Sequence, residues 1–156
     1  MRIGILTLPF EANYGWAVQR WALYHTIEKL GHQPTIINRR WSSNNTSCIN
    51  SFKRFVYYNV ICPRFKRFVD KETPSVTPVT RTPEETFEVS KHLDAVIVGS
   101  DQVWRIENTR LAGLDFFLDF LKDSLIKRLS YAASFGKDTW QGTEDETIKV
   151  KNLLQK

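Results

Sequence analysis

The chain has 156 residues, of which 42% are hydrophobic and 13% aromatic, and it carries a formal net charge of +5. That length suits one domain, or one half of something larger, and this composition excludes a globally disordered chain. The two cysteines, Cys48 and Cys62, have no CxxC spacing and no nearby histidine pair. We therefore expect free thiols in a reducing compartment and no zinc site.

The amino-terminal residues predict a strand, a helix and a second strand. Arg2–Leu8 is a short apolar run that ends at Pro9, as is typical of a buried parallel strand. This run is too short for a secretory or membrane-spanning segment, so we expect a cytoplasmic protein. A helix should follow from about Gly15 to Leu30, because Gly31 stands where a left-handed C-cap glycine is expected. Residues 34–38 should form the second strand.

Both faces of this first helix carry apolar side chains. One stripe consists of Trp16, Leu23, Ile27 and Leu30. Much of the other face consists of Val18, Trp21 and Ala22. This pattern predicts a helix buried on both sides, as at a domain interface.

The middle of the chain breaks the alternation of strands and helices. Residues 41–47 are a polar loop, residues 49–69 are basic and aromatic with a helical pattern, and residues 71–83 form a proline-containing linker. Residues 39–71 contain eight Lys or Arg and one acid, Asp70, which gives this window a charge of +7 and the rest of the chain −2. The pI near 9.3 therefore describes one segment, and a nucleic-acid-binding fold does not follow from it.

The remaining residues predict two helices and three strands. Thr82 should cap a short helix to about Lys91, with a proline at its first position and acids in its first turn. Residues 94–99 should form a third strand, and residues 116–120 and 127–136 two more. Thr143–Glu146 is a capping-box pattern that opens a final helix reaching the last residue.

Strands that alternate with helices predict an α/β fold, here a single Rossmann-like domain over residues 1–156, with a parallel sheet flanked by helices. In such sheets the ligand site lies at the carboxyl ends of the strands, where the strand-to-helix loops gather. Three sequences should lie there: NYGWAVQ at 13–19, GSDQVW at 99–104 and SYAASFG at 130–136.

The first of these sequences opens the first helix. Free backbone N–H groups and the helix dipole at Asn13, Tyr14 and Gly15 favour an anionic or oxygen-rich ligand. Gln19 lies beside the end of the apolar stripe, so its side chain is either directed into a cleft or satisfied by a nearby backbone group. The sequence is not GxGxxG, so a dinucleotide fingerprint is absent.

The second sequence places four hydrogen-bonding side chains directly after a buried strand. Gly99 permits a sharp turn, and Ser100 could equally cap a helix. Asp101 and Gln102 offer the acceptors and donors that sugar hydroxyls require, and Trp104 offers a stacking face. The alternative is a structural turn with a buried tryptophan.

The third sequence combines small residues with hydroxyls and ends in Ser134 and Phe135. Small residues let the backbone approach a ligand closely, but they also serve tight helix–sheet packing. His25, His32 and His92 are interpreted as surface or capping residues, so neither a metal site nor a nucleophilic triad is predicted.

In this order and spacing, NYGWAVQRWAL, VGSDQVW, FFLDF and KRLSYAASFGKDTW resemble the polysaccharide pyruvyl transferase family. The resemblance covers nearly the whole chain except a divergent basic and aromatic segment at about 40–80. It implies the N-terminal half of a two-domain, glycosyltransferase-B-like protein. The chain departs from the family at Val18, where a leucine is usual, and at Arg105–Ile106, where Asn-Pro commonly follows the tryptophan.

The resemblance also implies an activity, namely transfer of a pyruvyl group from phosphoenolpyruvate to a sugar of a cell-surface polysaccharide as a ketal. Asp101 would be the catalytic hydroxyl partner or base. The sugar would be bound by Asn13, Tyr14, Gly15, Gln19, Gly99, Ser100, Gln102, Trp104, Ser134 and Phe135. No cofactor or metal is implied beyond phosphoenolpyruvate as the donor substrate.

Members of the family are about twice as long as this chain, and the cations that hold the donor belong mostly to their second half. We therefore expect the C-terminal domain to be absent here and the 156-residue chain alone to be inactive. Two other functions stay open at this point. One is a truncated, non-catalytic fragment or glycan-binding module, and the other is a nucleotide-sugar glycosyltransferase-like domain.

Residues 39–71 alternate Lys and Arg with aromatic side chains, a mixture that anionic membrane surfaces attract. One interpretation is peripheral association with the inner face of the membrane, beside a lipid-linked glycan acceptor. The other is a variable insertion whose aromatic side chains pack on the sheet and whose charges are merely solvated. No nucleic-acid partner is expected.

Overall fold

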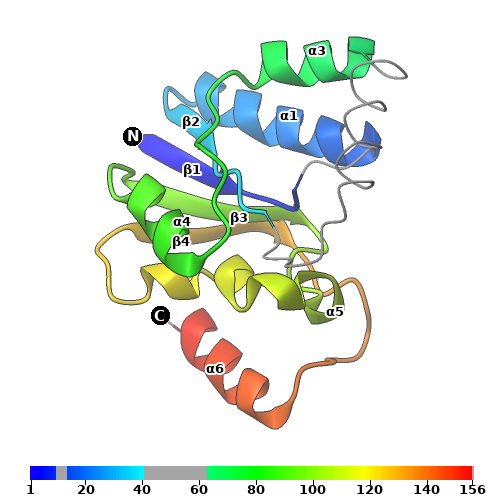
Figure 1. The fold of residues 1–156 in the computed structure, drawn as a ribbon, viewed down its shortest axis with the longest axis vertical. Helices are drawn as coiled ribbons and strands as arrows, with labels where there is room; N and C mark the ends of the chain where they lie inside the picture. The colour runs from blue at the N-terminus through cyan, green and yellow to red at the C-terminus, as the bar shows by residue number, and fades with distance from the viewer. Residues whose placement is uncertain (10–13, 41–62, 156) are drawn as a thin grey trace.

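The computed structural model describes residues 1–9, 14–40 and 63–155. At its centre lies a parallel sheet of four strands in the order β2-β1-β3-β4 (Figure 1). The strands are β1 (Arg2–Leu6), β2 (Gln33–Ile36), β3 (Ala95–Asp101) and β4 (Lys127–Ala133). The parallel α/β fold is thus confirmed, and each of these strands falls within two or three residues of its predicted position.

Helices cover both faces of this sheet (Figure 1). They are α1 (Tyr14–Lys29), α3 (Pro63–Glu72), α4 (Pro83–Ser90), α5 (Ile106–Thr109) and α6 (Glu144–Leu154). Three short 3-10 turns lie between α5 and β4, namely η2 (Arg110–Ala112), η3 (Asp115–Phe117) and η4 (Asp119–Leu121). α1 packs on one face of the sheet with α3 beside it, and α4, the 3-10 turns and α6 lie on the other side.

α1 is buried mainly on the side that faces the sheet. Leu23, Tyr24 and Ile27 pack against β1 and β2, and Gly31 has the positive φ, 80°, expected of a C-cap glycine. The prediction of burial on both sides is wrong, because α3 covers only the amino-terminal part of α1, where Val69 meets the ring of Trp16. Of the other predicted buried residues, Val18, Trp21, Ala22 and Leu30 are exposed.

The predicted strand over residues 116–120 is also wrong, because this segment forms η3 and the start of η4. Phe116, Phe117 and Leu118 are consecutive and all buried. Phe116 and Leu118 belong to one core cluster, and Phe117 lines the same cavity as Leu118. Alternation in a strand would send Phe117 to the face opposite its two neighbours. Leu118 has a left-handed backbone with φ 59°, so the chain turns there and all three side chains remain buried.

The residues expected to be a linker, 71–83, contain the end of α3 and then run along the outer edge of β2. Parallel bridges join Ile36 to Val76 and Arg39 to Thr80. Buried threonines stabilise this edge, since Thr86 Oγ1 donates to Thr80 Oγ1 at 3.1 Å. The prolines in this segment do not prevent the pairing because they alternate with residues that supply the backbone donors.

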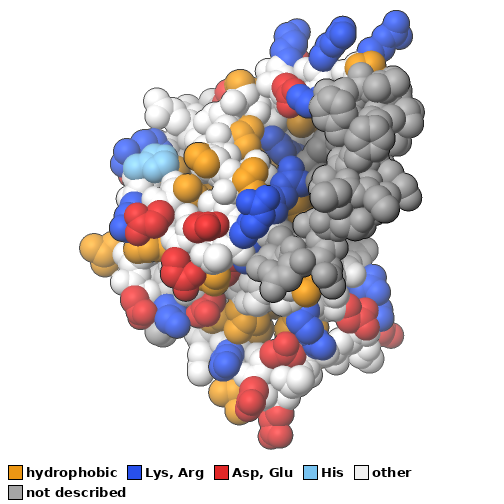
Figure 2. Space-filling model, viewed as in Figure 1, with side chains coloured by type: hydrophobic (Ala, Val, Ile, Leu, Met, Phe, Trp, Pro, Cys, Tyr) orange, Lys and Arg blue, Asp and Glu red, His pale blue; other side chains and the backbone are white. Residues whose placement is uncertain are grey.

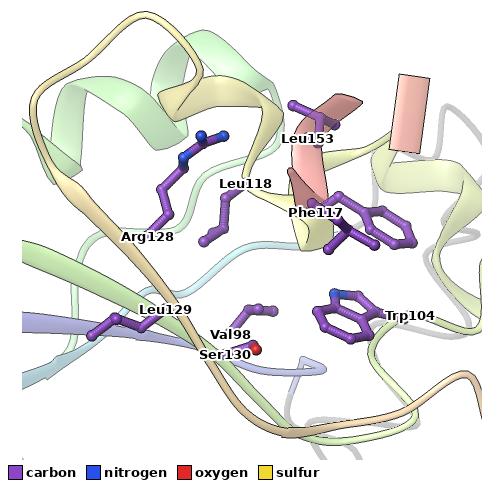
Figure 3. A pocket seen from close by; sticks show the side chains of 9 residues that line it. Val98, Trp104, Phe117, Leu118, Arg128, Leu129, Ser130 and Leu153 are labelled. Atoms are coloured by element: carbon purple, nitrogen blue, oxygen red, sulfur yellow. The ribbon is translucent and has the colours of Figure 1, made fainter. Parts of the chain in front are cut away.

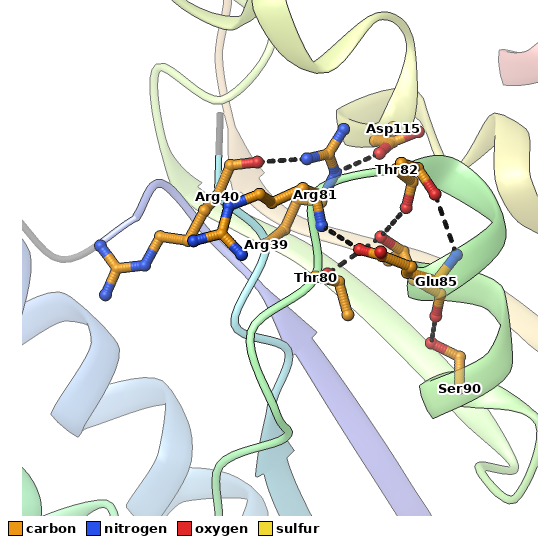
Figure 4. Close-up of polar contacts among 9 residues, drawn as sticks. Arg39, Arg40, Thr80, Arg81, Thr82, Glu85, Ser90 and Asp115 are labelled. Atoms are coloured by element: carbon orange, nitrogen blue, oxygen red, sulfur yellow. Dashed lines mark hydrogen bonds and ion pairs between the residues drawn. The ribbon is translucent and has the colours of Figure 1, made fainter. Parts of the chain in front are cut away.

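Both predicted helix caps are confirmed. Thr82 Oγ1 accepts the backbone N–H of Glu85 at 3.2 Å at the start of α4 (Figure 4). Thr143 and Glu146 form a reciprocal capping box at the start of α6. These bonds satisfy backbone donors that the first helical turn would otherwise leave unpaired.

Most of the predicted basic and aromatic segment, residues 41–62 together with Cys48 and Cys62, lies outside the described residues. Its carboxyl-terminal part is α3, which confirms a helix there. Phe65 packs toward the cluster around Trp16, whereas Arg64, Arg67 and Phe68 are exposed. Lys and Arg side chains gather over α3 at the top of the view in Figure 2.

Candidate functional site

β3 ends at the carboxyl edge of the sheet, and the loop that follows begins at Gln102. Close to this end the strand requires glycine at position 99. Gly99 has φ 120°, and a Cβ there would overlap the backbone carbonyl of Tyr131 on β4. The absence of a side chain therefore lets β3 run close beside β4. Ser100 and Asp101 follow directly, both partly buried.

Asp101 has an unusual backbone for a residue with a side chain. Its φ is 97°, in a region that residues other than glycine rarely adopt and that costs of order 1–3 kcal/mol. Its Oδ1 accepts the backbone N–H of Gln102 at 2.7 Å. Its Oδ2 forms no hydrogen bond with any described residue, so one carboxylate oxygen is held in place and the other can receive a proton.

The structure brings this loop together with the end of β4, as predicted from the sequence. The backbone N–H of Ser134 donates to the carbonyl of Asp101 at 3.0 Å, and the N–H of Trp104 donates to the carbonyl of Ser134 at 3.1 Å. Gly136 lies against the side chain of Gln102, where a Cβ would overlap the amide. The second and third predicted sequences therefore lie in contact with each other at the carboxyl edge of the sheet.

A chain of polar side chains holds Gln102. Its Oε1 accepts from Arg105 Nη1 at 3.2 Å, and Arg105 Nη2 pairs with Glu107 Oε2 at 3.1 Å. Lys137 reaches the same carboxylate oxygen at 3.2 Å. Hydrogen bonds from Arg105 and then Lys137 lower the pKa of Glu107 below its usual range, so this carboxyl is charged at neutral pH. Since Oε1 is occupied, Gln102 can offer its Nε2 donors to a ligand.

Sequence reasoning missed Arg105, Glu107 and Lys137 as part of the site. In the sequence, Arg105 stands out only as a departure from the family pattern. A signal was present, since an arginine and a glutamate lie three and five residues after Gln102. Lys137 lies in the loop after β4, and only the fold shows that it pairs with Glu107.

Trp104 holds the loop after β3 in place through its contacts with η3. Its Nε1–H donates to the carbonyl of Phe116 at 2.9 Å, and its ring stacks on Phe117 with centroids 5.9 Å apart and an interplanar angle of 7°. The two rings form one wall of a cavity of about 130 Å³ between β4, η3 and α6 (Figure 3). The ring of Phe135 also packs on the ring of Trp104, with centroids 5.4 Å apart and an interplanar angle of 41°. These contacts favour the structural interpretation of Trp104.

η3 is fixed from its other side by a buried ion pair. Arg39, three residues after the end of β2, binds the carboxylate of Asp115 through Nε and the carbonyl of Arg40 through Nη1 (Figure 4). The side chains of Arg39 and Asp115 are each only 2% exposed. Burial raises the pKa of Asp115, and the charge of Arg39 opposes that rise. Arg39, which the sequence places in a basic segment with solvated charges, is therefore buried.

Among the described residues, those predicted at the start of α1 form no hydrogen bond with Asp101 or Gln102. Asn13 lies outside the described residues, and Tyr14 packs on Phe65 with centroids 4.5 Å apart. Gly15 and Gln19 are exposed, and Gln19 has no hydrogen bond to Asp101 or Gln102. At the carboxyl ends of β1 and β3, which pair as far as Leu6 and Val98, Thr7 Oγ1 donates a long hydrogen bond to the carbonyl of Ser100, 3.4 Å.

The described residues contain no group of three or more His, Cys, Asp or Glu that could hold a metal ion. Within the same ranges no helix is long and apolar enough to cross a membrane. A protein-family model described as polysaccharide pyruvyl transferase matches residues 13–156. The chain belongs to the polysaccharide pyruvyl transferase family. No curated protein matches it.

The family match spans all three strand-end sequences. Two of them meet around Asp101, where the polysaccharide pyruvyl transferase chain offers one carboxylate oxygen and the Nε2 group of Gln102 beside the loop after β4. A carboxylate beside an amide donor can accept a proton from a hydroxyl and orient its neighbour. The arrangement therefore suits chemistry on a polyhydroxylated substrate.

Proposed function

We propose that this polysaccharide pyruvyl transferase chain supplies the acceptor side of pyruvyl transfer, with phosphoenolpyruvate as donor and a sugar of a cell-surface glycan as acceptor. In that reaction the methylene carbon of the donor's enol phosphate receives a proton and becomes a methyl group. Two sugar hydroxyl oxygens become bonded to the adjacent carbon, whose bond to the phosphate oxygen breaks. The acceptor loses two protons, one of which balances the proton added to the methylene while the other leaves with the phosphate, and a positioned base promotes this loss.

The observation that carries the proposal is the conformation of Asp101. A non-glycine residue at φ 97° is kept only where the surrounding structure enforces it, and such residues cluster at functional sites. The N–H of Gln102 fixes Oδ1 of Asp101 and so sets the orientation of the carboxylate. The other oxygen, Oδ2, would serve as the base for the sugar hydroxyl. Gln102 Nε2 would donate to a neighbouring sugar oxygen.

The donor requires cations for its carboxylate and phosphate. Near Asp101 the described part of the chain offers Arg105 and Lys137, and both are already paired with Glu107. We therefore assign donor binding to a second, facing half, as in the two-domain architecture implied by the family, and acceptor binding to this chain.

The test is a ketal-formation assay with phosphoenolpyruvate and an oligosaccharide acceptor. It compares the 156-residue chain alone with the same chain joined to the second half of a family member. We expect turnover only in the joined protein, and Asp101→Asn should lower it by about 10²-fold or more. Asn tolerates a positive φ well, so this variant should fold.

Two results would overturn the assignment. Near-normal turnover by Asp101→Asn would make Asp101 a turn residue, and turnover by the isolated chain would show that donor binding also resides in it. Binding of glycan without transfer in either protein would favour a glycan-binding module instead.

A further inference from the structure

A second cavity lies between the β4 loop and α6, next to the candidate site. Its volume is about 330 Å³, within the range of small-molecule pockets. Its walls are mainly apolar and include Phe135, Trp140, Val150 and Leu154, with Lys137 and Lys151 at the rim. Nothing in the proposed reaction at Asp101 uses this space.

The aromatic walls are unusually accessible. Phe135 is 36% exposed and Trp140 37% exposed, and the two rings meet edge to face with centroids 5.7 Å apart. Trp140 is held in place because its Nε1–H donates to Thr147 Oγ1 at 2.7 Å on α6. A fixed, exposed ring presents a negative face to which the C–H groups on one side of a pyranose can pack.

The rim adds a charge preference. Lys137 and Lys151 line the cavity with one acid, Asp138, which leaves an excess of positive charge. Lys151 forms no salt bridge with any described carboxylate, whereas Lys137 is shared with Glu107. An anionic group on a ring seated at Trp140 would therefore find an unneutralised ammonium on α6.

The cavity is connected to the candidate site by the polar chain described above. Glu107 binds Lys137 at the rim and also Arg105, which holds Gln102. Phe135 contacts both Trp104 and Trp140. A glycan with one sugar at Asp101 could thus place a neighbouring sugar in the cavity.

We infer that this cavity is a second acceptor subsite that binds an acidic sugar, a pyranose ring carrying a carboxylate, adjacent to the sugar that is modified. The inference rests on the proposed function for the identity of the ligand as a glycan. Trp140 supplies the stacking face and Lys151 the charge that selects a carboxylate over a neutral hydroxymethyl group. The subsite makes acceptor choice depend on two sugars instead of one.

The experiment is an NMR titration of the 156-residue chain with methyl β-glucuronide and with methyl β-glucoside, which differ only in the carboxylate. We expect the glucuronide to shift the resonances of Phe135, Trp140 and Lys151 and to bind more tightly than the glucoside. Lys151→Gln should weaken glucuronide binding by about two- to fivefold, as for one partly exposed ion pair, and leave glucoside binding unchanged. Lys149→Gln, on the same helix and outside the cavity lining, is the matched control.

Trp140→Leu tests the stacking face and should abolish binding of both glycosides, with the fold checked by amide spectra. If that variant unfolds, the Lys151 and Lys149 pair still decides the question. Equal affinity for the two glycosides, shifts located elsewhere, or no shifts at all would overturn the inference. Shifts of the same residues with protein concentration alone would assign the cavity to a second copy of the chain. Because this binding is measured without donor, it can fail while ketal formation at Asp101 succeeds, or the reverse.

Discussion

Arg39 and Asp115 connect the end of β2 to η3, which carries the carbonyl that anchors Trp104. Removing one member of a buried pair leaves the other charge without compensation, which costs about 3–5 kcal/mol. Asp115→Asn should therefore lower the free energy of unfolding by that amount in urea denaturation. The double variant Arg39→Met with Asp115→Leu should lose much less, because neither charge is then buried.

The same pair gives a pH dependence whose sign follows from the raised pKa of Asp115. A carboxyl whose pKa is higher in the folded than in the unfolded state binds more protons when folded, so its contribution favours the folded state at low pH and is lost as pH rises through the folded pKa. Arg39→Met removes the charge that opposes this rise. We expect the unfolding free energy of the single variant Arg39→Met to increase as pH falls from 7 toward the unfolded pKa of about 4. The reference is the double variant Arg39→Met, Asp115→Leu, which lacks this carboxyl. A flat difference would contradict the assignment.

Gly136 couples the β4 loop to Gln102. Its φ is 66°, and an added Cβ would overlap the Gln102 amide. Gly113 has nearly the same φ, 62°, with nothing within 4 Å of an added Cβ, so Gly113→Ala is a matched control for backbone strain alone. We expect Gly113→Ala to lose about 1 kcal/mol of stability from backbone strain, and Gly136→Ala to lose more because of the added overlap. Only Gly136→Ala should shift the side-chain amide signal of Gln102, and a shift in both would mean that the contact does not hold this side chain.

At the scale of elements, α6 depends on its capping box. Thr143→Ala should cost about 1 kcal/mol in the local stability of α6, measured by amide hydrogen exchange. The backbone N–H of Thr143, which donates to Glu146, holds the pKa of Glu146 below its usual range. This stabilisation is present above the unfolded pKa of about 4.3 and is lost as pH falls through the folded pKa. Glu146→Gln should make the protection of α6 insensitive to pH in that window.

α3 exposes part of the basic segment to solvent. Its exposed basic side chains therefore allow a test of whether this segment binds anionic membranes. Each basic residue near an anionic bilayer contributes about 1 kcal/mol. Replacing Arg64, Arg67 and Lys71 by Gln should reduce sedimentation with anionic vesicles at low salt, with no effect on neutral vesicles. Replacing Lys29, Lys122 and Lys149 by Gln changes the net charge equally and is the control. An equal loss in both triple variants would show that only net charge matters.

The elements that could be predicted from the sequence are those whose signals are local. The caps at Thr82 and Thr143 and the C-cap glycine Gly31 depend on residues within one turn, and all three are confirmed. Residues 116–120 were mistaken for a strand because a run of buried aromatic and aliphatic side chains does not reveal whether they share one face. The meeting of the loops after β3 and β4 followed from parallel topology alone. The network through Arg105, Glu107 and Lys137 did not, since it joins side chains that only the tertiary fold brings together.

At the scale of the whole molecule, the sheet is protected unequally at its two edges. The β2 edge is covered by residues 76–80, whereas β4 pairs only with β3 among the described strands. On β4, Leu129 is 46% exposed and Tyr131 61% exposed. An edge strand with open backbone groups and exposed apolar side chains is a template for pairing with another chain.

We therefore expect the purified 156-residue chain to self-associate through β4, with a weight-average mass that increases with concentration in sedimentation experiments. Leu129→Lys should reduce this association, because a charge on the edge opposes strand addition. Leu125→Lys is the control, since Leu125 is fully exposed and lies just before the strand, so that the same change leaves the edge intact. If both variants associate like the unmodified chain, β4 is not the contact. If both lose association equally, general hydrophobicity accounts for it, and the strand edge does not.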